Sequence, residues 1–188
     1  MRNAIRIPSA GLVAIALTTV PAPAASPAPE PDAAWVSAGP AQTPDLGRWR
    51  LSRHGFGRLT VGLTRSEIER RAGRRLRFVY HTGSCAIWHV RGARGLSIMT
   101  TRGRLARVYI GSGHWRTSLG IGLGDTESKV RSRYPRLRTE PHAYDPDVQY
   151  LIVRGPRRRV VFETDGNDEV TGIRGGRVPE VMYVEGCA

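Results

Sequence analysis

The chain has 188 residues, of which 29 are lysine or arginine and 16 are aspartate or glutamate, giving a formal net charge of +13. After its N-terminal segment it has no apolar stretch near the roughly 20 residues that a membrane-spanning helix needs, which argues against a transmembrane protein. Two cysteines and five histidines show no ligand spacing such as C-x-x-C or H-x-x-x-H, so we expect no metal site and no cofactor.

Residues 1–24 have the three parts of a cleavable secretory signal. The segment begins with two arginines, continues with an apolar run of about 14 residues and ends in small residues that fit a signal peptidase. We expect cleavage between Ala24 and Ala25 and a secreted protein, either extracellular or periplasmic. The alternative is an uncleaved helical anchor, for which the apolar run is short.

Residues 25–47 are rich in proline, alanine and serine. Such a segment buries too little surface to offset its ordering entropy, so we expect a disordered linker. The remaining residues, 48–188, are enough for one compact body. Cys85 and Cys187 predict one disulfide in an exported chain, which would stabilise the fold by roughly 4 to 5 kcal/mol in the chain-entropy model. Two free thiols are the alternative.

The body contains an internal repeat. The segment LTVGLT, which ends at Thr64, is echoed about 60 residues later by LGIGLG, which ends at Gly124. Each copy precedes a predicted helix: Thr64 and Glu67 predict a capping box for the first, and Thr126 is the expected N-cap of the second. The repeat predicts one unit at about 55–113 and a second at about 117–188.

Short strand-like runs separated by turn residues follow each predicted helix. They cover residues 78–80, 85–90, 96–101 and 105–110 in the first unit, and 148–153, 159–164, 169–173 and 181–185 in the second. A helix followed by an antiparallel meander, twice, predicts an α+β fold whose two units are joined by the disulfide.

Both repeat motifs carry a family resemblance. Each precedes a short helix and a meander, and together they resemble the β-lactamase-inhibitor-protein and SmpA/OmlA-like lipoprotein fold group; the motifs are Val61-Gly62-Leu63-Thr64-x-x-Glu67-Ile68 and Ile121-Gly122-Leu123-Gly124-Asp125-Thr126. The resemblance covers roughly residues 55–187. Members of the group are mostly binding modules, either inhibitors that grip an enzyme with a concave sheet or assembly lipoproteins. The resemblance therefore implies a non-catalytic binder, although this chain lacks a lipid-anchor cysteine.

The sequence contains only weak matches to known catalytic motifs. Glycines 120, 122 and 124 precede a helix and could cradle a phosphate, but no P-loop lysine follows, so structural turn glycines are favoured. No G-x-S-x-G motif occurs, and the acidic run 165–169 is predicted to be a hairpin turn rather than a calcium loop. We assign no catalytic residue and keep a small secreted hydrolase as a third hypothesis.

Alternation along the predicted strands separates two faces. It places Trp88 opposite Ile87, and Arg107 opposite Val108. If one face packs on the helices, the other presents a candidate protein-binding face of Trp88, Met99, Arg107 and Tyr109. Because such residues are typical of binding hot spots, the leading hypothesis is a secreted binding or inhibitory module for an unknown extracellular protein. The alternative is that Trp88 belongs to the core.

The arginines are distributed unevenly. Residues 48–138 contain 21 basic and 4 acidic side chains, and residues 139–188 contain 6 and 9. Clusters in and after the two helices could form a continuous stripe, which predicts as the second hypothesis a binder of cell-wall polymer, anionic lipid or nucleic acid. The alternative is a solvated surface in which arginine replaces lysine. The clusters are Arg70, Arg71, Arg74, Arg75 and Arg77, and Arg131, Arg133, Arg136 and Arg138.

Overall fold

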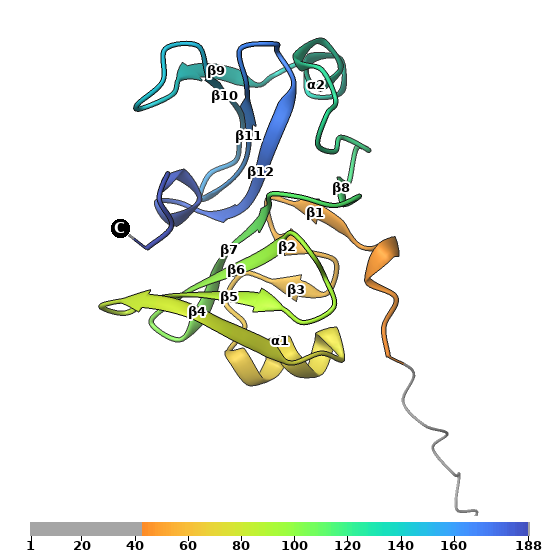
Figure 1. The fold of residues 1–188 in the computed structure, drawn as a ribbon, viewed down its shortest axis with the longest axis vertical. Coiled ribbons are helices and arrows are strands. Elements are labelled where there is room, and N and C mark those ends of the chain that lie inside the picture. The colour runs from red at the N-terminus through yellow and green to blue at the C-terminus, as the bar shows by residue number, and fades with distance from the viewer. Residues whose placement is uncertain (1–42, 188) are drawn as a thin grey trace, which may run out of the picture. The chain divides into compact units, whose positions relative to one another are not determined.

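The computed structural model describes residues 43–187 (Figure 1). The predicted signal and most of the predicted linker lie outside these residues and stay predictions. The first described element is η1, a 3₁₀ turn at Leu46–Arg48. Leu46 is 3% exposed and belongs to the hydrophobic core, so the ordered body begins before residue 48.

The larger of two sheets has eight strands in the order β4-β5-β6-β7-β12-β11-β10-β9, and every neighbouring pair is antiparallel. Two four-stranded meanders, β4 to β7 and β9 to β12, are thus joined through their last strands. The strands are β4 (Leu76–Thr82), β5 (Cys85–Val90), β6 (Leu96–Thr101), β7 (Arg104–Ile110), β9 (Arg138–Pro141), β10 (Gln149–Arg154), β11 (Arg158–Thr164) and β12 (Val170–Arg177).

The smaller sheet has four short strands in the order β3-β2-β1-β8, with β1 and β8 parallel. Sequence reasoning missed this sheet and also β9, because strands of two to four residues are too short to display an alternating pattern. The small sheet consists of β1 (Arg50–Ser52), β2 (Gly55–Phe56), β3 (Leu59–Thr60) and β8 (Arg116–Thr117).

Two short helices begin at threonine caps. Helix α1 spans Arg65–Ala72; the Thr64 side chain accepts a hydrogen bond from the Glu67 amide, and the Glu67 carboxylate accepts one from the Thr64 amide. This reciprocal pairing satisfies two amides that the helix itself leaves free. Helix α2 spans Glu127–Arg133 and is capped by the Thr126 side chain.

The helices and the small sheet cover one face of the large sheet. The main core lies there: Ile68 of α1, Val130 of α2 and Phe56 of β2 pack in one cluster with Ile98 and Phe162 of the large sheet. All five side chains are fully buried, and burying each contributes about 1.5 to 3 kcal/mol.

Only glycine fits where the small sheet meets β12. A Cβ atom on Gly175 would lie 2.4 Å from the backbone oxygen of Ser52. The absence of a side chain at Gly175 therefore allows strand β1 to approach the large sheet at van der Waals distance.

The C-terminal segment, Val178–Cys187, crosses the opposite face of the large sheet, and we call it the strap. The strand predicted at 181–185 is wrong, because the strap forms a 3₁₀ turn, η2, at Glu180–Met182. Strand β12 already pairs with β7 and β11, so the chain beyond it has no neighbouring edge to join. Val181 instead packs on the sheet face, and Cys187 forms the predicted disulfide with Cys85.

Two helices, together with sheets that are antiparallel except for the pairing of β1 with β8, agree with the predicted α+β class. The structural equivalence of the two predicted repeat units stays a prediction. Within residues 43–187, no helix is long and apolar enough to cross a membrane.

Candidate binding site

The strap is fastened to the sheet along its length. The disulfide holds its end on β5, with the two Cα atoms 5.5 Å apart. The Tyr80 hydroxyl donates to the backbone oxygen of Glu185 over 3.0 Å and accepts from the Cys187 amide over 3.3 Å. At the other end of the strap, Val181 is buried in a cluster supplied by β10 and β11. The strap thus packs across the middle of this face of the sheet.

Two arginines are buried between the strap and the large sheet. Arg107 on β7 is 6% exposed and Arg174 on β12 is 2% exposed. The Nη1 atoms of both donate to one acceptor, the backbone oxygen of Tyr183, over 2.5 and 2.8 Å. Arg107 also donates to the backbone oxygen of Glu180 over 3.3 Å. The adjacent central strands therefore hold the strap through a pair of cations.

The two arginines differ in how their charge is balanced. Arg174 donates to the carboxylate of Glu163 over 3.1 Å and lies over the Tyr150 ring at 4.9 Å. Arg107 forms no ion pair with any described residue, and its partners are neutral carbonyl groups. Burial, and secondarily the charge of Arg174, lowers the pKa of Arg107 to about 10. Arg107 is still cationic at neutral pH, and this buried charge has no carboxylate at ion-pair distance among residues 43–187.

Arg107 also keeps unused hydrogen-bonding capacity. Its Nε atom is buried without a partner. Its Nη2 atom forms no hydrogen bond with any of residues 43–187. A buried guanidinium with a free N–H group favours a bound anion, because an anion supplies both the missing acceptor and the missing charge.

A cavity of about 230 Å³ lies beside Arg107, between the sheet and the strap. Its lining combines apolar side chains, hydroxyl groups, the two arginines and two acidic residues, Glu163 and Glu185. We call it the Arg107 cavity. It is lined by Tyr80, Ile87, Ser97, Met99, Arg107, Tyr109, Glu163, Arg174, Val184, Glu185 and Gly186.

Tyr109 is placed in this cavity by two glycines. A Cβ atom on Gly111 would lie 2.7 Å from the Tyr109 ring, and one on Gly172 would lie 3.1 Å from its hydroxyl oxygen. Burial, followed by the negative charge of Glu163, raises the pKa of Tyr109. The phenol therefore remains protonated and can donate a hydrogen bond to a ligand.

A second, wider cavity of about 610 Å³ lies over the turn between β5 and β6, and we call it the basic groove. Three arginines and a histidine border it, and no carboxylate does. Ser97 borders both cavities. The groove is lined by Arg77, His89, Val90, Arg91, Gly92, Ala93, Arg94, Gly95, Leu96, Ser97 and Ser112.

The structure separates Trp88 from the other candidates of the predicted binding face. Met99 and Arg107 pair across β6 and β7 and line the Arg107 cavity, as does Tyr109. Trp88 pairs with Ile98 instead and packs against the main core on the other face of the sheet. Its indole donates to Thr100 over 2.9 Å. The alternation of side chains within each strand was predicted correctly, but the register between neighbouring strands was not.

The two predicted arginine clusters do not form one stripe. The first cluster ends in β4 and the second in β9, which are the opposite edges of the eight-stranded sheet. Seven strand spacings separate these edges, which is roughly 30 Å. The clusters were expected to adjoin because they hold similar positions after their helices, but the meanders join through β7 and β12 and leave β4 and β9 outermost.

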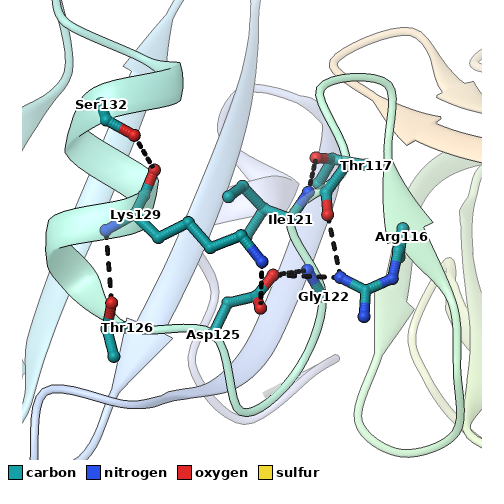
Figure 2. Close-up of polar contacts among 9 residues, drawn as sticks. Arg116, Thr117, Ile121, Gly122, Asp125, Thr126, Lys129 and Ser132 are labelled. Atoms are coloured by element: carbon teal, nitrogen blue, oxygen red, sulfur yellow. Dashed lines mark hydrogen bonds and ion pairs between the residues drawn. The ribbon is translucent and has the colours of Figure 1, made fainter.

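The glycine loop before α2 is closed by its own carboxylate (Figure 2). Asp125 accepts from the Gly122 amide over 2.8 Å, from Arg116 over 3.1 Å and from Lys129 over 2.6 Å. The Gly124 amide donates to a backbone oxygen of β12 over 2.8 Å. Because these amides already have acceptors, the loop is built as a structural turn before the helix.

Sequence reasoning missed Arg174, Glu163 and Tyr80 as parts of the candidate site. A signal for Arg174 was present: it is a charged residue between Ile173 and glycine, directly after a predicted strand run, and it lies in the interior of β12. Within the described residues, no group of three or more histidine, cysteine, aspartate or glutamate side chains could hold a metal ion.

Comparisons with known proteins give distant similarities. No family model and no curated protein matches the chain. An extracellular protein containing an SCP domain from Bacillus anthracis aligns with a TM-score of 0.47 and 10% identity, over 63% of this chain and 44% of that protein. The uncharacterized protein yfeY from Escherichia coli aligns with a TM-score of 0.43 and 16% identity, over 68% of this chain and 99% of that protein. Membership of the fold group named above stays a prediction.

Proposed function

We propose that this chain is an exported binding module that recognises another protein by taking one of its acidic groups into the Arg107 cavity. Export is supported by the sequence of residues 1–24 and by the disulfide, since disulfides persist in oxidising compartments. The interaction surface is the strand face around Met99 and Tyr109, with the strap as its opposite wall.

One observation carries the proposal: Arg107 is a buried cation at the edge of a cavity, and it has no ion-pair partner among residues 43–187. A carboxylate bound there would accept from Nη2 and would neutralise the guanidinium. Hydrogen bonds between charged groups contribute about 1.5 to 3 kcal/mol, enough to make Arg107 an anchor of an interface.

The other walls favour a protein ligand. Val184 is partly exposed and offers apolar contact, Ile87 and Met99 line the cavity with 8% and 1% exposure, and Ser97 and Tyr109 offer hydroxyl groups. A glutamate side chain has an apolar stem and a charged end, which match these two kinds of wall. A ligand recognised by charge alone would gain no affinity from an apolar lining residue such as Met99.

A peptide selection tests this function. The secreted, disulfide-bonded protein is panned against a phage-displayed random peptide library, and the affinity of each selected peptide is measured for wild type and for Arg107→Met. We expect the peptides to be enriched in aspartate and glutamate and to bind Arg107→Met at least about tenfold more weakly, which equals 1.4 kcal/mol. The matched control is Arg136→Met, an exposed arginine outside both cavities.

Peptides without acidic residues, or equal binding to wild type and Arg107→Met, would overturn the proposal. If Arg107→Met does not fold, competition on wild type decides. N-acetyl-glutamate amide should displace the selected peptides, and N-acetyl-glutamine amide at the same concentration should not. Equal displacement by both compounds would contradict recognition of the charge.

A further inference from the structure

The Arg107 cavity and the basic groove lie on the same face of the same strands. Cross-strand pairing puts Ile87, Met99 and Arg107 in one row across β5, β6 and β7. The next row, two residues along each strand, contains Ser97 and Tyr109. Side chains two residues apart share a face, so both rows point toward the strap side of the sheet.

The basic groove continues this face beyond the second row. Its border residue Arg91 follows the last residue of β5 and is four positions after Ile87, which corresponds to about 13 Å of extended chain. Ser97 borders both cavities, so the two cavities meet at this middle row. The two cavities therefore follow one line, with Arg107 at one end and Arg91 with Arg94 at the other.

Arginine side chains lie at both ends of this line of cavities. Arg107 has no ion-pair partner among residues 43–187. The arginines that border the groove, Arg77, Arg91 and Arg94, form no ion pair with a described carboxylate either. Arg77 instead contacts the ring of His89, Nη2 to Nδ1, over 2.8 Å. An arginine-containing subsite thus lies at each end of this line, and the backbone positions of Ile87 and Arg91 are about 13 Å of extended chain apart.

We propose that the two cavities form one elongated site for an acidic protein segment bound in an extended conformation, with two carboxylates four residues apart. This inference rests on the proposed function and names the ligand class of the same site. Four residues of extended chain span about 13 Å, the same length as the estimated interval from Ile87 to Arg91. One carboxylate enters the Arg107 cavity and the other lies in the basic groove.

The shape of the Arg107 cavity favours a peptide over an acidic polysaccharide. The strap covers the cavity, so the ligand must reach Nη2 with a thin, flexible branch. A glutamate side chain supplies three carbon–carbon bonds between the backbone and its carboxylate carbon. A uronate carries its carboxylate directly on the sugar ring, which would have to enter the cavity with it.

Spaced peptides test the inference. Capped glycine-serine peptides with two glutamates at i,i+2, i,i+4 or i,i+6 are titrated into isotopically labelled protein, with binding measured by NMR. The peptides with one glutamate replaced by glutamine are the matched controls. We expect the i,i+4 peptide to bind at least about fivefold more tightly than either single-glutamate peptide. It should exceed the i,i+2 and i,i+6 peptides by the same factor, because only the i,i+4 spacing fits both subsites.

Variants assign each carboxylate to its subsite. Arg91→Gln combined with Arg94→Gln should abolish the gain from the second glutamate and leave single-glutamate binding within about twofold. Arg107→Met should weaken single-glutamate binding itself. The control, Arg136→Gln with Arg138→Gln, places the same charge loss at the opposite edge of the sheet and should change neither.

Each result separates this inference from the proposed function. If single-glutamate binding depends on Arg107 but the second glutamate adds nothing at any spacing, the elongated site is wrong and the proposed function stands. If single-glutamate binding does not depend on Arg107, the proposed function fails as well. A sulfated or uronate oligosaccharide that binds more tightly than the i,i+4 peptide, and loses affinity in the Arg91/Arg94 variant, would overturn the peptide assignment in favour of a polysaccharide.

Discussion

Arg107 and Arg174 donate to the same backbone oxygen, that of Tyr183, from the two central strands of the eight-stranded sheet. Their strands are adjacent, since Arg174 pairs with Tyr109 two residues from Arg107. One carbonyl of the strap therefore lies between two guanidinium groups, of which, among residues 43–187, only that of Arg174 has a carboxylate partner. This difference is the basis of our proposal that Arg107 binds an acidic group of another protein.

The first prediction concerns the disulfide. Cys85 and Cys187 are 102 positions apart, so the bond closes a long loop in the unfolded chain. Replacing both by serine should lower the free energy of unfolding by about 4 to 5 kcal/mol in the chain-entropy model. Equilibrium urea unfolding measures the loss, and either single serine variant should match the double variant. A loss below about 1 kcal/mol in the double variant would contradict the expectation.

The second prediction compares a buried and an exposed ion pair. Arg174→Met should destabilise the fold by about 3 kcal/mol or more, because it leaves the Glu163 carboxylate without its arginine. The combined Arg174→Met, Glu163→Gln variant should recover part of the loss. Arg154→Met removes an exposed pair with Glu140, 2.7 Å long, and should cost less than about 1 kcal/mol. Equal losses for the two arginines in urea unfolding would count against this account.

Part of the fold follows from the sequence because it depends on local patterns. Two threonine-capped helices, most strands of the large sheet and the turn at 165–169 have signals within a few residues of chain. The pairing of Cys85 with Cys187 follows from there being two cysteines in a chain expected to be exported. Side-chain alternation likewise separated Arg107 from Val108 within β7.

The candidate site depends on relations between distant segments, which such patterns do not contain. A register shift between Met99 and Thr100, together with the turn lengths, decides that Arg107 shares a row with Ile87 and that Trp88 faces the other way. Residues 181–185 of the strap were expected to be a strand, since they form a short, mostly apolar run. Its position is decided by the sheet face that buries Val181 and by the arginines that bind Tyr183.

The third prediction separates the two faces. Trp88 packs on the core, donates to Thr100 and lies under the Arg65 guanidinium at 4.5 Å. Trp88→Ala should therefore lower the free energy of unfolding by about 3 kcal/mol and leave the affinity for acidic peptides within about twofold. Tyr109→Ala should have the reverse effect, with peptide affinity reduced at least about fivefold. Urea unfolding and peptide titration on the same preparations provide both readouts.

A loss of peptide affinity in Trp88→Ala, measured where the variant is fully folded, would place Trp88 in the binding site after all. Gly172→Ala offers a separate check on Tyr109. The added methyl group would lie 3.1 Å from the phenol oxygen, so it should shift the ring and weaken peptide binding without removing any polar group.

The last prediction is a pH dependence at the loop before α2. Burial opposes ionisation of Asp125, but hydrogen bonds from Lys129 and from the Gly122 amide outweigh it and hold the pKa of this carboxyl below 3.8. A carboxyl whose pKa is lower in the folded state stabilises the fold above the pKa of the unfolded state, and this stabilisation is lost as the pH falls through the folded value. Asp125→Asn should therefore flatten the decline in unfolding free energy between about pH 5 and pH 2. Urea unfolding across that range measures the slope. The control, Asp147→Asn, changes an exposed carboxylate and should leave the slope unchanged. Equal slopes for wild type and Asp125→Asn would show that the contacts in Figure 2 do not stabilise the charged form of Asp125.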